Sequence, residues 1–202
     1  MSAKVRLFVL VIIASLALDF GTKVAVRRTL APDASAKQAY RTTYRPGLDP
    51  WCQLSQRQIR VVEGFFDICY SENTGVAFGL GKKVPWGVWV GVGVLALGLI
   101  LTFLRQARDD QRLLVFSLAL VGSGAIGNIA DRARFGYVTD FVVWRWHEHT
   151  WPTFNVADAA LVVGVILMFL TMGKKRDEAG EDEKAERGGD SPRAKRGRRK
   201  AR

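Results

Sequence analysis

The sequence predicts a mainly α-helical membrane protein, a four-helix transmembrane bundle with a small β-sheet unit on its outer side. The chain is 49% hydrophobic, although it carries a formal net charge of +11 over 202 residues. Four windows are nearly free of charged residues, at residues 7–18, 86–104, 113–129 and 156–172. In a helix on the surface of a soluble protein, apolar and charged residues alternate with the 3.6-residue period of the helix, which gives one apolar and one charged face. These windows are instead apolar on nearly every side. They therefore favour membrane spans.

The first window is short, and it admits two interpretations. Residues 7–18 have the length of the apolar core of a secretory signal peptide, and residues 34–36 are similar to a cleavage site. However, Asp19, Lys23 and two arginines separate the apolar run from that site, which makes the polar stretch too long. We therefore predict one retained helix over residues 4–26, on which Asp19 and Lys23 share a face because they are four residues apart.

The other three windows, 86–104, 113–129 and 156–172, fit the roughly 17–25 residues that a spanning helix needs. Small residues recur within the third span, at Gly122, Gly124 and Gly127. Glycines at such positions let neighbouring helices approach closely, although ordinary packing explains them equally well.

Two long segments, residues 27–85 and 130–155, connect the spans on the outer side. Residues 31–58 contain three prolines and many polar residues, which is typical of an irregular loop. Residues 59–70 and 137–146 are rich in β-branched and aromatic residues, which predicts strands.

The outer segments also hold both cysteines and both histidines of the chain. Cys52 and Cys69 lie in the same segment, where a disulfide and two separate thiols are about equally plausible. His147 and His149 lie apart from the cysteines, so no metal site is predicted. The tryptophans of the second segment are typical of a belt at the membrane interface, and they are Trp144, Trp146 and Trp151.

The basic residues predict which side of the membrane each span faces. They cluster before the first span, between the second and third, and after the fourth, as Lys4, Arg6, Arg105, Arg108, Arg112, Lys174, Lys175 and Arg176. An even number of spans puts these three groups on one side, which the positive-inside rule identifies as the cytoplasm. Both termini are then cytoplasmic, and the two long segments face outward.

The end of the chain differs in composition from the rest. Residues 173–202 contain almost no apolar side chains and many charges of both signs, so they cannot bury enough surface to fold. We predict a membrane domain at residues 1–172 and a disordered, charged cytoplasmic tail at 173–202. Its basic end could contact anionic lipid or nucleic acid, but a solvated tail that enforces orientation is the simpler interpretation.

The polar residues of the spans collect in one layer. Because successive spans run in opposite directions, the outer ends of the first, third and fourth spans lie at the same boundary as the outer segments. The residues brought to this layer are Asp19, Asn73, Asn128, Asp131, Arg132, Asp140, Asn155 and Asp158.

Two of these carboxylates suggest catalysis. A charge within a span costs about 2.5–3.5 kcal/mol on insertion scales, and Asp158 lies one turn into an apolar helix. For Asp131 and Arg132, which are neighbours at a helix end, an ion pair or a cap is the simpler explanation. Asp140 and Asp158 have no adjacent Lys or Arg, so if they meet, one keeps a proton at neutral pH. One carboxylate can then take a proton from water while the other donates to an oxyanion, as an aspartic peptidase requires.

Other classes of function stay open at this point. A small membrane transporter or proton relay could use Asp19, Asp140 and Asp158, although such proteins tend to place charged groups near the midplane. A scaffold whose basic tail recruits a cytoplasmic partner is a further possibility. A serine or cysteine peptidase is disfavoured, because neither histidine lies near a plausible nucleophile.

Five short motifs also occur in a recognisable order. They are Asp19-Phe20-Gly21-Thr22-Lys23, Asn73-Thr74-Gly75-Val76-Ala77-Phe78, Gly124-Ala125-Ile126-Gly127-Asn128-Ile129-Ala130-Asp131-Arg132, Val138-Thr139-Asp140-Phe141 and Phe154-Asn155-Val156-Ala157-Asp158. In these motifs and in its four spans the chain resembles the bacterial lipoprotein signal peptidase (signal peptidase II) family, across roughly residues 7–172. Ser123 replaces a glycine usual in that family, and residues 31–58 look longer than its usual connection.

The resemblance implies an intramembrane aspartic endopeptidase of the bacterial inner membrane, with a periplasmic β-cradle and its active site at the periplasmic side. It implies removal of the signal peptide from prolipoproteins, by cleavage N-terminal to a diacylglyceryl-modified cysteine. Asp140 and Asp158 would be catalytic. The substrate-binding or supporting residues would be Asp19, Lys23, Asn73, Gly75, Asn128, Asp131, Arg132 and Asn155. Membrane lipids and the peptide inhibitor globomycin are expected as ligands, with no metal, cofactor, nucleic acid or obligatory protein partner.

Overall fold

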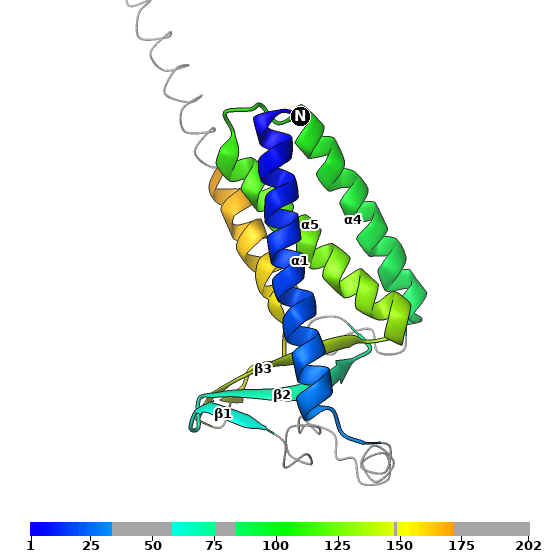
Figure 1. Ribbon diagram of the computed structural model, residues 1–202, viewed down its shortest axis with the longest axis vertical. Coiled ribbons are helices and arrows are strands. Elements are labelled where there is room, and N and C mark those ends of the chain that lie inside the picture. The colour runs from blue at the N-terminus through cyan, green and yellow to red at the C-terminus, as the bar shows by residue number, and fades with distance from the viewer. Residues whose placement is uncertain (34–57, 76–83, 148, 172–202) are drawn as a thin grey trace, which may run out of the picture.

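The computed structural model describes residues 1–33, 58–75, 84–147 and 149–171. The elements in these ranges are α1 (Ala3–Leu30), β1 (Ile59–Val62), β2 (Phe66–Asn73), α4 (Trp86–Gln106), α5 (Arg112–Phe135), β3 (Val138–Trp146), β4 (His149–Thr150) and a last helix, Val156–Thr171. The helices lie side by side, and the sheet lies at the end of the bundle where α1 finishes (Figure 1). The expected mainly helical class with a small antiparallel sheet is confirmed.

Three of the described helices, α1, α4 and α5, are long and apolar enough to cross a membrane. The last helix, Val156–Thr171, is apolar but shorter within the described residues. On α1 and α4 only 17% and 11% of the apolar window is buried, against 50% on α5. Apolar side chains left exposed on α1 and α4 are what lipid-facing helices require, and α5 is the central helix of the bundle.

Two helices continue at least one turn past the ends predicted for them, and α4 continues two residues past its predicted end, to Gln106. The first predicted span stops at residue 26 and the third at residue 129, whereas α1 reaches Leu30 and α5 reaches Phe135. The extra turns carry charged residues. A prediction that follows the apolar windows therefore ends before them. α5 ends where Gly136 adopts a left-handed conformation, with φ of 78°.

Glycines on α5 allow close helix contacts, as two of the three predicted positions show. A Cβ atom on Gly124 would lie 2.4 Å from the carbonyl oxygen of Ala157, and one on Gly127 would lie 2.5 Å from Oδ2 of Asp19. At Gly122 a Cβ atom would meet its nearest neighbours only at 3.8 Å, which is ordinary contact. Gly124 and Gly127 therefore allow α5 to approach the last helix and α1 closely, while Gly122 has room for a methyl group.

The sheet is antiparallel, with strand order β1-β2-β3-β4. Both predicted strand regions are confirmed, the first as two strands joined by a turn in which Gly64 has φ of 72°. Asp140 on β3 pairs with Ser71 on β2, and Asn73 pairs with Val138. The register of this pair of strands shifts between Ile68 and Ser71. The sheet thus brings Asn73 and Asp140 together at the end of the helix bundle.

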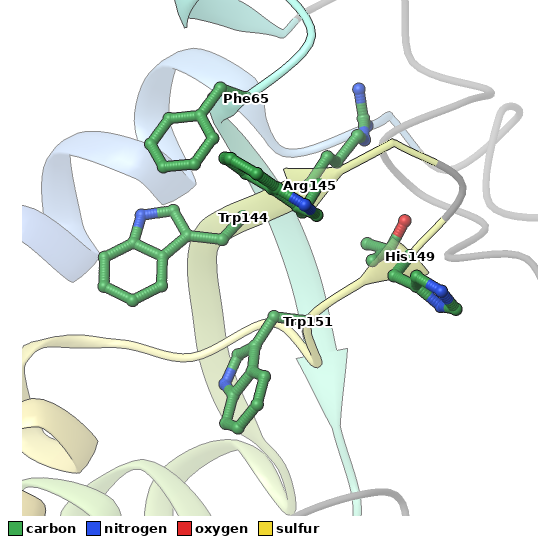
Figure 2. Close-up of a pocket in the computed structure, with 7 residues that line it drawn as sticks. Phe65, Trp144, Arg145, His149 and Trp151 are labelled. Carbon is green, nitrogen blue, oxygen red and sulfur yellow. The ribbon is translucent and has the colours of Figure 1, made fainter.

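Aromatic side chains surround a shallow pocket of about 240 Å³ elsewhere on the sheet (Figure 2). Its lining residues are Phe65, Trp144, Arg145, Trp146, His149, Thr150 and Trp151. The three tryptophans expose 48–66% of their surface, as a belt at the membrane interface would require. Their contact with lipid stays a prediction.

Cys69 lies on β2, is fully buried and is disulfide-bonded. The other cysteine of the chain, Cys52, lies outside the described residues, as do most of the predicted loop at 31–58 and the predicted tail at 173–202.

Candidate active site

Asp140 is a fully buried carboxyl group on β3, at the junction of the sheet and the helices. Its Oδ1 accepts a hydrogen bond from Nδ2 of Asn155 at 2.6 Å, and its Oδ2 accepts one from Nδ2 of Asn73 at 2.9 Å. Both donors are neutral amides. They orient the carboxyl group without providing a countercharge in direct contact with it.

Asp158 is held at the start of the last helix by reciprocal hydrogen bonds with Asn155. The backbone N–H of Asp158 donates to Oδ1 of Asn155 at 3.0 Å, and the backbone N–H of Asn155 donates to Oδ2 of Asp158 at 3.3 Å. This arrangement is a capping box, in which the N-cap side chain and the third helical residue satisfy each other's N–H groups. Nδ2 of Asn128 donates to Oδ1 of Asp158 at 2.7 Å, so α5 fixes the other carboxyl oxygen.

Asn155 joins the two acidic residues, since it donates to Asp140 through its side chain and to Asp158 through its backbone. The same Nδ2 also donates to Oδ1 of Asn128 at 3.2 Å. Burial raises the pKa of Asp140 to about 8, and the nearby negative charge of Asp158 acts in the same direction. Asp140 therefore favours its protonated form at neutral pH.

A buried ion-pair cluster lies beside the two carboxyl groups. Nζ of Lys23 is fully buried, 2.9 Å from Oδ2 of Asp19 and 3.3 Å from Oδ2 of Asp131, and it donates to Oδ1 of Asn128 at 3.3 Å. Oδ1 of Asp19 accepts a hydrogen bond from the backbone N–H of Ala157 at 3.0 Å. The cluster ties α1 to α5 and to the first turn of the last helix. Asp19 and Lys23 contact each other on one face of α1, as predicted.

The ion pair expected for Asp131 and Arg132 has different partners. Asp131 pairs with Lys23 and with Arg27, whose Nη1 lies 3.0 Å from its Oδ1. Arg132 instead donates from Nη2 to the carbonyl oxygen of Gly75 at 2.6 Å. Asp131 is therefore ion-paired as expected, but not with Arg132. Consecutive helix residues point in different directions, so Asp131 faces α1 while Arg132 faces the loop after β2.

Gly75 also donates its backbone N–H to Oδ1 of Asn73 at 3.0 Å, which links the loop to the residue that orients Asp140. Residues 76–78 of the same motif lie outside the described residues. Nε of Arg132 is buried and has no hydrogen-bond partner among the described residues. All ten site residues expected from the sequence thus belong to one connected region.

Sequence reasoning missed two residues of this region, Arg27 and Thr139. Arg27 lies just past the predicted end of the first span, where a basic residue is typical of a membrane flank. The available signal was its spacing, because residues 19, 23 and 27 fall at four-residue intervals on one helix face. Thr139 gave no comparable signal.

Comparisons with known proteins identify the family of the chain. The family model described as signal peptidase (SPase) II matches residues 11–174. The lipoprotein signal peptidase of Geobacter metallireducens is 38% identical over 174 residues, covering 85% of this chain and 93% of the relative. That of Geobacter sulfurreducens is 38% identical over 171 residues, covering 83% and 91%. That of Symbiobacterium thermophilum is 43% identical over 113 residues, covering 56% and 74%.

Two solved bacterial membrane enzymes share the fold. One has a TM-score of 0.64 at 23% identity and covers 85% of this chain and 90% of its own. The other has a TM-score of 0.60 at 23% identity and covers 82% and 91%. The sequence match spans most of the chain and includes both Asp140 and Asp158, and on this ground the chain belongs to the signal peptidase II family of proteases.

Proposed function

We propose that this protein is a membrane-embedded aspartic endopeptidase whose catalytic groups are Asp140 and Asp158. As a signal peptidase II, it removes the signal peptide from prolipoproteins. We assign the cleavage to the peptide bond on the N-terminal side of a diacylglyceryl-modified cysteine. The observation that carries the proposal is the position of Asn155, which hydrogen-bonds to both carboxyl groups.

The chemistry follows from two carboxyl groups that share one proton. The ionised carboxylate accepts a proton from a water molecule, whose oxygen attacks the scissile carbonyl carbon. The protonated carboxyl donates to the oxyanion as it forms, which gives a tetrahedral intermediate without a covalent bond to the enzyme. Collapse of this intermediate breaks the carbon–nitrogen bond. The carboxyl that accepted the proton from water gives it to the leaving nitrogen, and a hydroxyl of the intermediate returns a proton to the other carboxylate, which restores the starting state.

The surrounding residues have separate roles in this proposal. Asn128 and Asn155 orient the carboxyl oxygens, and Asn73 fixes Oδ2 of Asp140. We assign Arg132 and Gly75, which contact each other, to the binding of an extended substrate backbone.

We further propose four membrane spans, with both termini in the cytoplasm and the sheet in the periplasm. Nζ of Lys4 donates to the carbonyl oxygens of Arg105 and Ala107, so α1 begins and α4 ends on the same side. The basic residues near that side favour the cytoplasm under the positive-inside rule. Residues 1–172 form the peptidase domain in this scheme, and residues 173–202 form a separate tail.

This orientation suits a lipidated substrate, which is itself anchored in the bilayer. Its acyl chains can remain among membrane lipids against the apolar outer sides of the helices while its peptide reaches the acidic pair. The peptide inhibitor globomycin is proposed to occupy the same site. No further protein partner is required.

The decisive test replaces each acidic residue with asparagine. In proteoliposomes containing a lipidated precursor, Asp140→Asn and Asp158→Asn should each lower the cleavage rate by at least about a hundredfold, because general acid–base catalysis is removed. Asp109→Asn, an exposed carboxyl between α4 and α5, is the matched control and should cleave at the normal rate. Normal processing by either site variant would remove that residue from the chemistry.

A further inference from the structure

Arg27 connects three elements behind the acidic pair. Its Nη1 lies 3.0 Å from Oδ1 of Asp131 on α5 and donates to Oγ1 of Thr139 on β3 at 2.7 Å. Its guanidinium carbon also lies 4.6 Å from the ring centroid of Phe135. One nitrogen atom of α1 therefore contacts both α5 and β3.

Thr139 is held on its backbone as well as its side chain. Its N–H donates to Oδ2 of Asp131 at 3.0 Å, while its hydroxyl accepts from Arg27. The side chain is fully buried. Arg27 and Asp131 together therefore fix the residue that immediately precedes Asp140.

The position of this contact relates it to Asp140. Successive side chains on a strand point to opposite faces, so Thr139 faces Arg27 on α1 while Asp140 faces Asn155. The pairing of β2 with β3 is irregular between Ile68 and Ser71, close to the pair formed by Ser71 and Asp140. Thr139 and Asp140 themselves pair with Glu72 and Ser71, next to this shift, so the contact with Arg27 and Asp131 adds side-chain constraints to those of the ladder.

We propose that Arg27 is a positioning residue for the peptidase reaction, which acts through Asp131 and Thr139 to fix the backbone that carries Asp140. The inference rests on the proposed catalytic role of Asp140. Loss of the guanidinium leaves Asp131 paired with Lys23, at 3.3 Å, so the buried carboxylate keeps a countercharge and the fold is expected to persist. The substitution removes the hydrogen bond from Arg27 to the hydroxyl of Thr139.

The first experiment compares Arg27→Gln with Arg28→Gln, since Arg28 is the exposed neighbour on the same helix. Cleavage of a lipidated precursor is measured in proteoliposomes. Arg27→Gln should lower kcat about 10- to 100-fold, the range for small misplacements of a catalytic group, with KM changed less than about twofold. The pH at which activity falls should not move, because Arg27 acts on position and not on protonation. Arg27→Lys should recover part of kcat, and Arg28→Gln should be normal.

A double-mutant cycle with Thr139→Val tests the route through Thr139. That variant keeps the backbone hydrogen bond to Asp131 but removes the hydroxyl that accepts from Arg27. If the two residues act together, the double variant should lose little more kcat than Arg27→Gln alone. Multiplicative losses, or normal kcat in Arg27→Gln, would overturn the proposal.

Different results would contradict the proposed function and the positioning role of Arg27. If Asp140→Asn cleaves normally, the catalytic assignment itself is wrong. If Asp140→Asn is inactive and Arg27→Gln has normal kcat, the acidic pair stands and only the positioning role is lost. A raised KM with unchanged kcat in Arg27→Gln would also contradict positioning, since it would indicate a contact with substrate.

Discussion

Asp140 combines full burial with two neutral amide donors and a second carboxyl group nearby. Burial in surroundings of low polarity disfavours the charged form, and the charge of Asp158 adds to this effect. Amide donors from Asn73 and Asn155 lower the pKa only in part. At the scale of a single residue, the result is a carboxylic acid that keeps its proton at the pH of the cell.

The raised pKa of Asp140 predicts the pH dependence of cleavage. The proposed mechanism requires one protonated and one ionised carboxyl group, so kcat/KM should follow a bell shape. The alkaline limb should lie near pH 8, where Asp140 loses its proton, with about a tenfold fall for each further pH unit. Cleavage of a lipidated precursor from pH 4 to pH 10 measures this profile. A constant rate between pH 6 and pH 10 would contradict it.

The same pKa predicts how stability changes with pH. In the unfolded chain an aspartate has a pKa of about 3.9, whereas Asp140 in the folded protein has a pKa of about 8. Between these values the folded state binds a proton that the unfolded state does not. The stabilisation from this proton is complete below about pH 4 and is lost as pH rises to about 8.

Thermal unfolding in detergent micelles tests this contribution across the same pH range. The midpoint of Asp140→Asn should depend less on pH between 4 and 8 than that of the unchanged protein, because asparagine does not titrate. Equal slopes for the two proteins would show that Asp140 is not the group responsible.

At the scale of elements, α5 organises the site because its glycines admit its neighbours. Gly127 lets Asp19 of α1 approach, and Gly124 lets the carbonyl of Ala157 approach. Ala157 in turn donates its N–H to Asp19 and lies next to Asp158. The helix contacts and the geometry of the proposed catalytic pair therefore depend on the same small residues.

Alanine substitutions on α5 should destabilise the protein only at glycines where a neighbouring helix leaves no space for a Cβ atom. Gly124→Ala should destabilise the protein by about 1–3 kcal/mol, because its Cβ would overlap backbone of the last helix. Gly122→Ala, with its nearest neighbours at 3.8 Å, is the matched control. It should be neutral or stabilising by up to about 1 kcal/mol, since alanine favours helix more than glycine does. Thermal unfolding of both variants checks this, and equal effects would show that close contact at Gly124 is not limiting.

At the scale of the whole molecule, the site lies where the sheet meets the helices. Asp140 and Asn73 come from the sheet, whereas Asp158, Asn155 and Asn128 come from the helices. This location at one end of the bundle fits cleavage of a bilayer-anchored substrate. It fits a proton relay less well, because relays tend to place their charged groups near the midplane.

The location of the site also predicts that the tail is dispensable. Every described contact of the acidic pair comes from residues 19–158, and the family match ends at residue 174. Deletion of residues 173–202 should therefore leave the cleavage rate in proteoliposomes within about twofold of normal. Loss of cleavage in a truncated protein that inserts normally would favour a function that depends on the tail.

The sequence alone determined the apolar helices, the two strand regions and the list of polar residues at one boundary. These features are local, because hydrophobic periodicity and β-branched composition depend only on residues close together in the chain. The five motifs supplied the family and the pair Asp140 and Asp158. Helix ends were less well predicted, since the last turns of α1 and α5 are charged and resemble membrane flanks.

Only the tertiary structure decided which polar groups meet. It assigned Asp131 to Lys23 and Arg27 and Arg132 to Gly75, and it placed Asn155 between Asp140 and Asp158. These pairings depend on how each helix is rotated toward its neighbours and on the register of β2 against β3. They involve residues up to 138 positions apart in the chain. Burial, which raises the pKa of Asp140, is likewise a property of the assembled fold, because no stretch of sequence fixes how much water reaches a side chain.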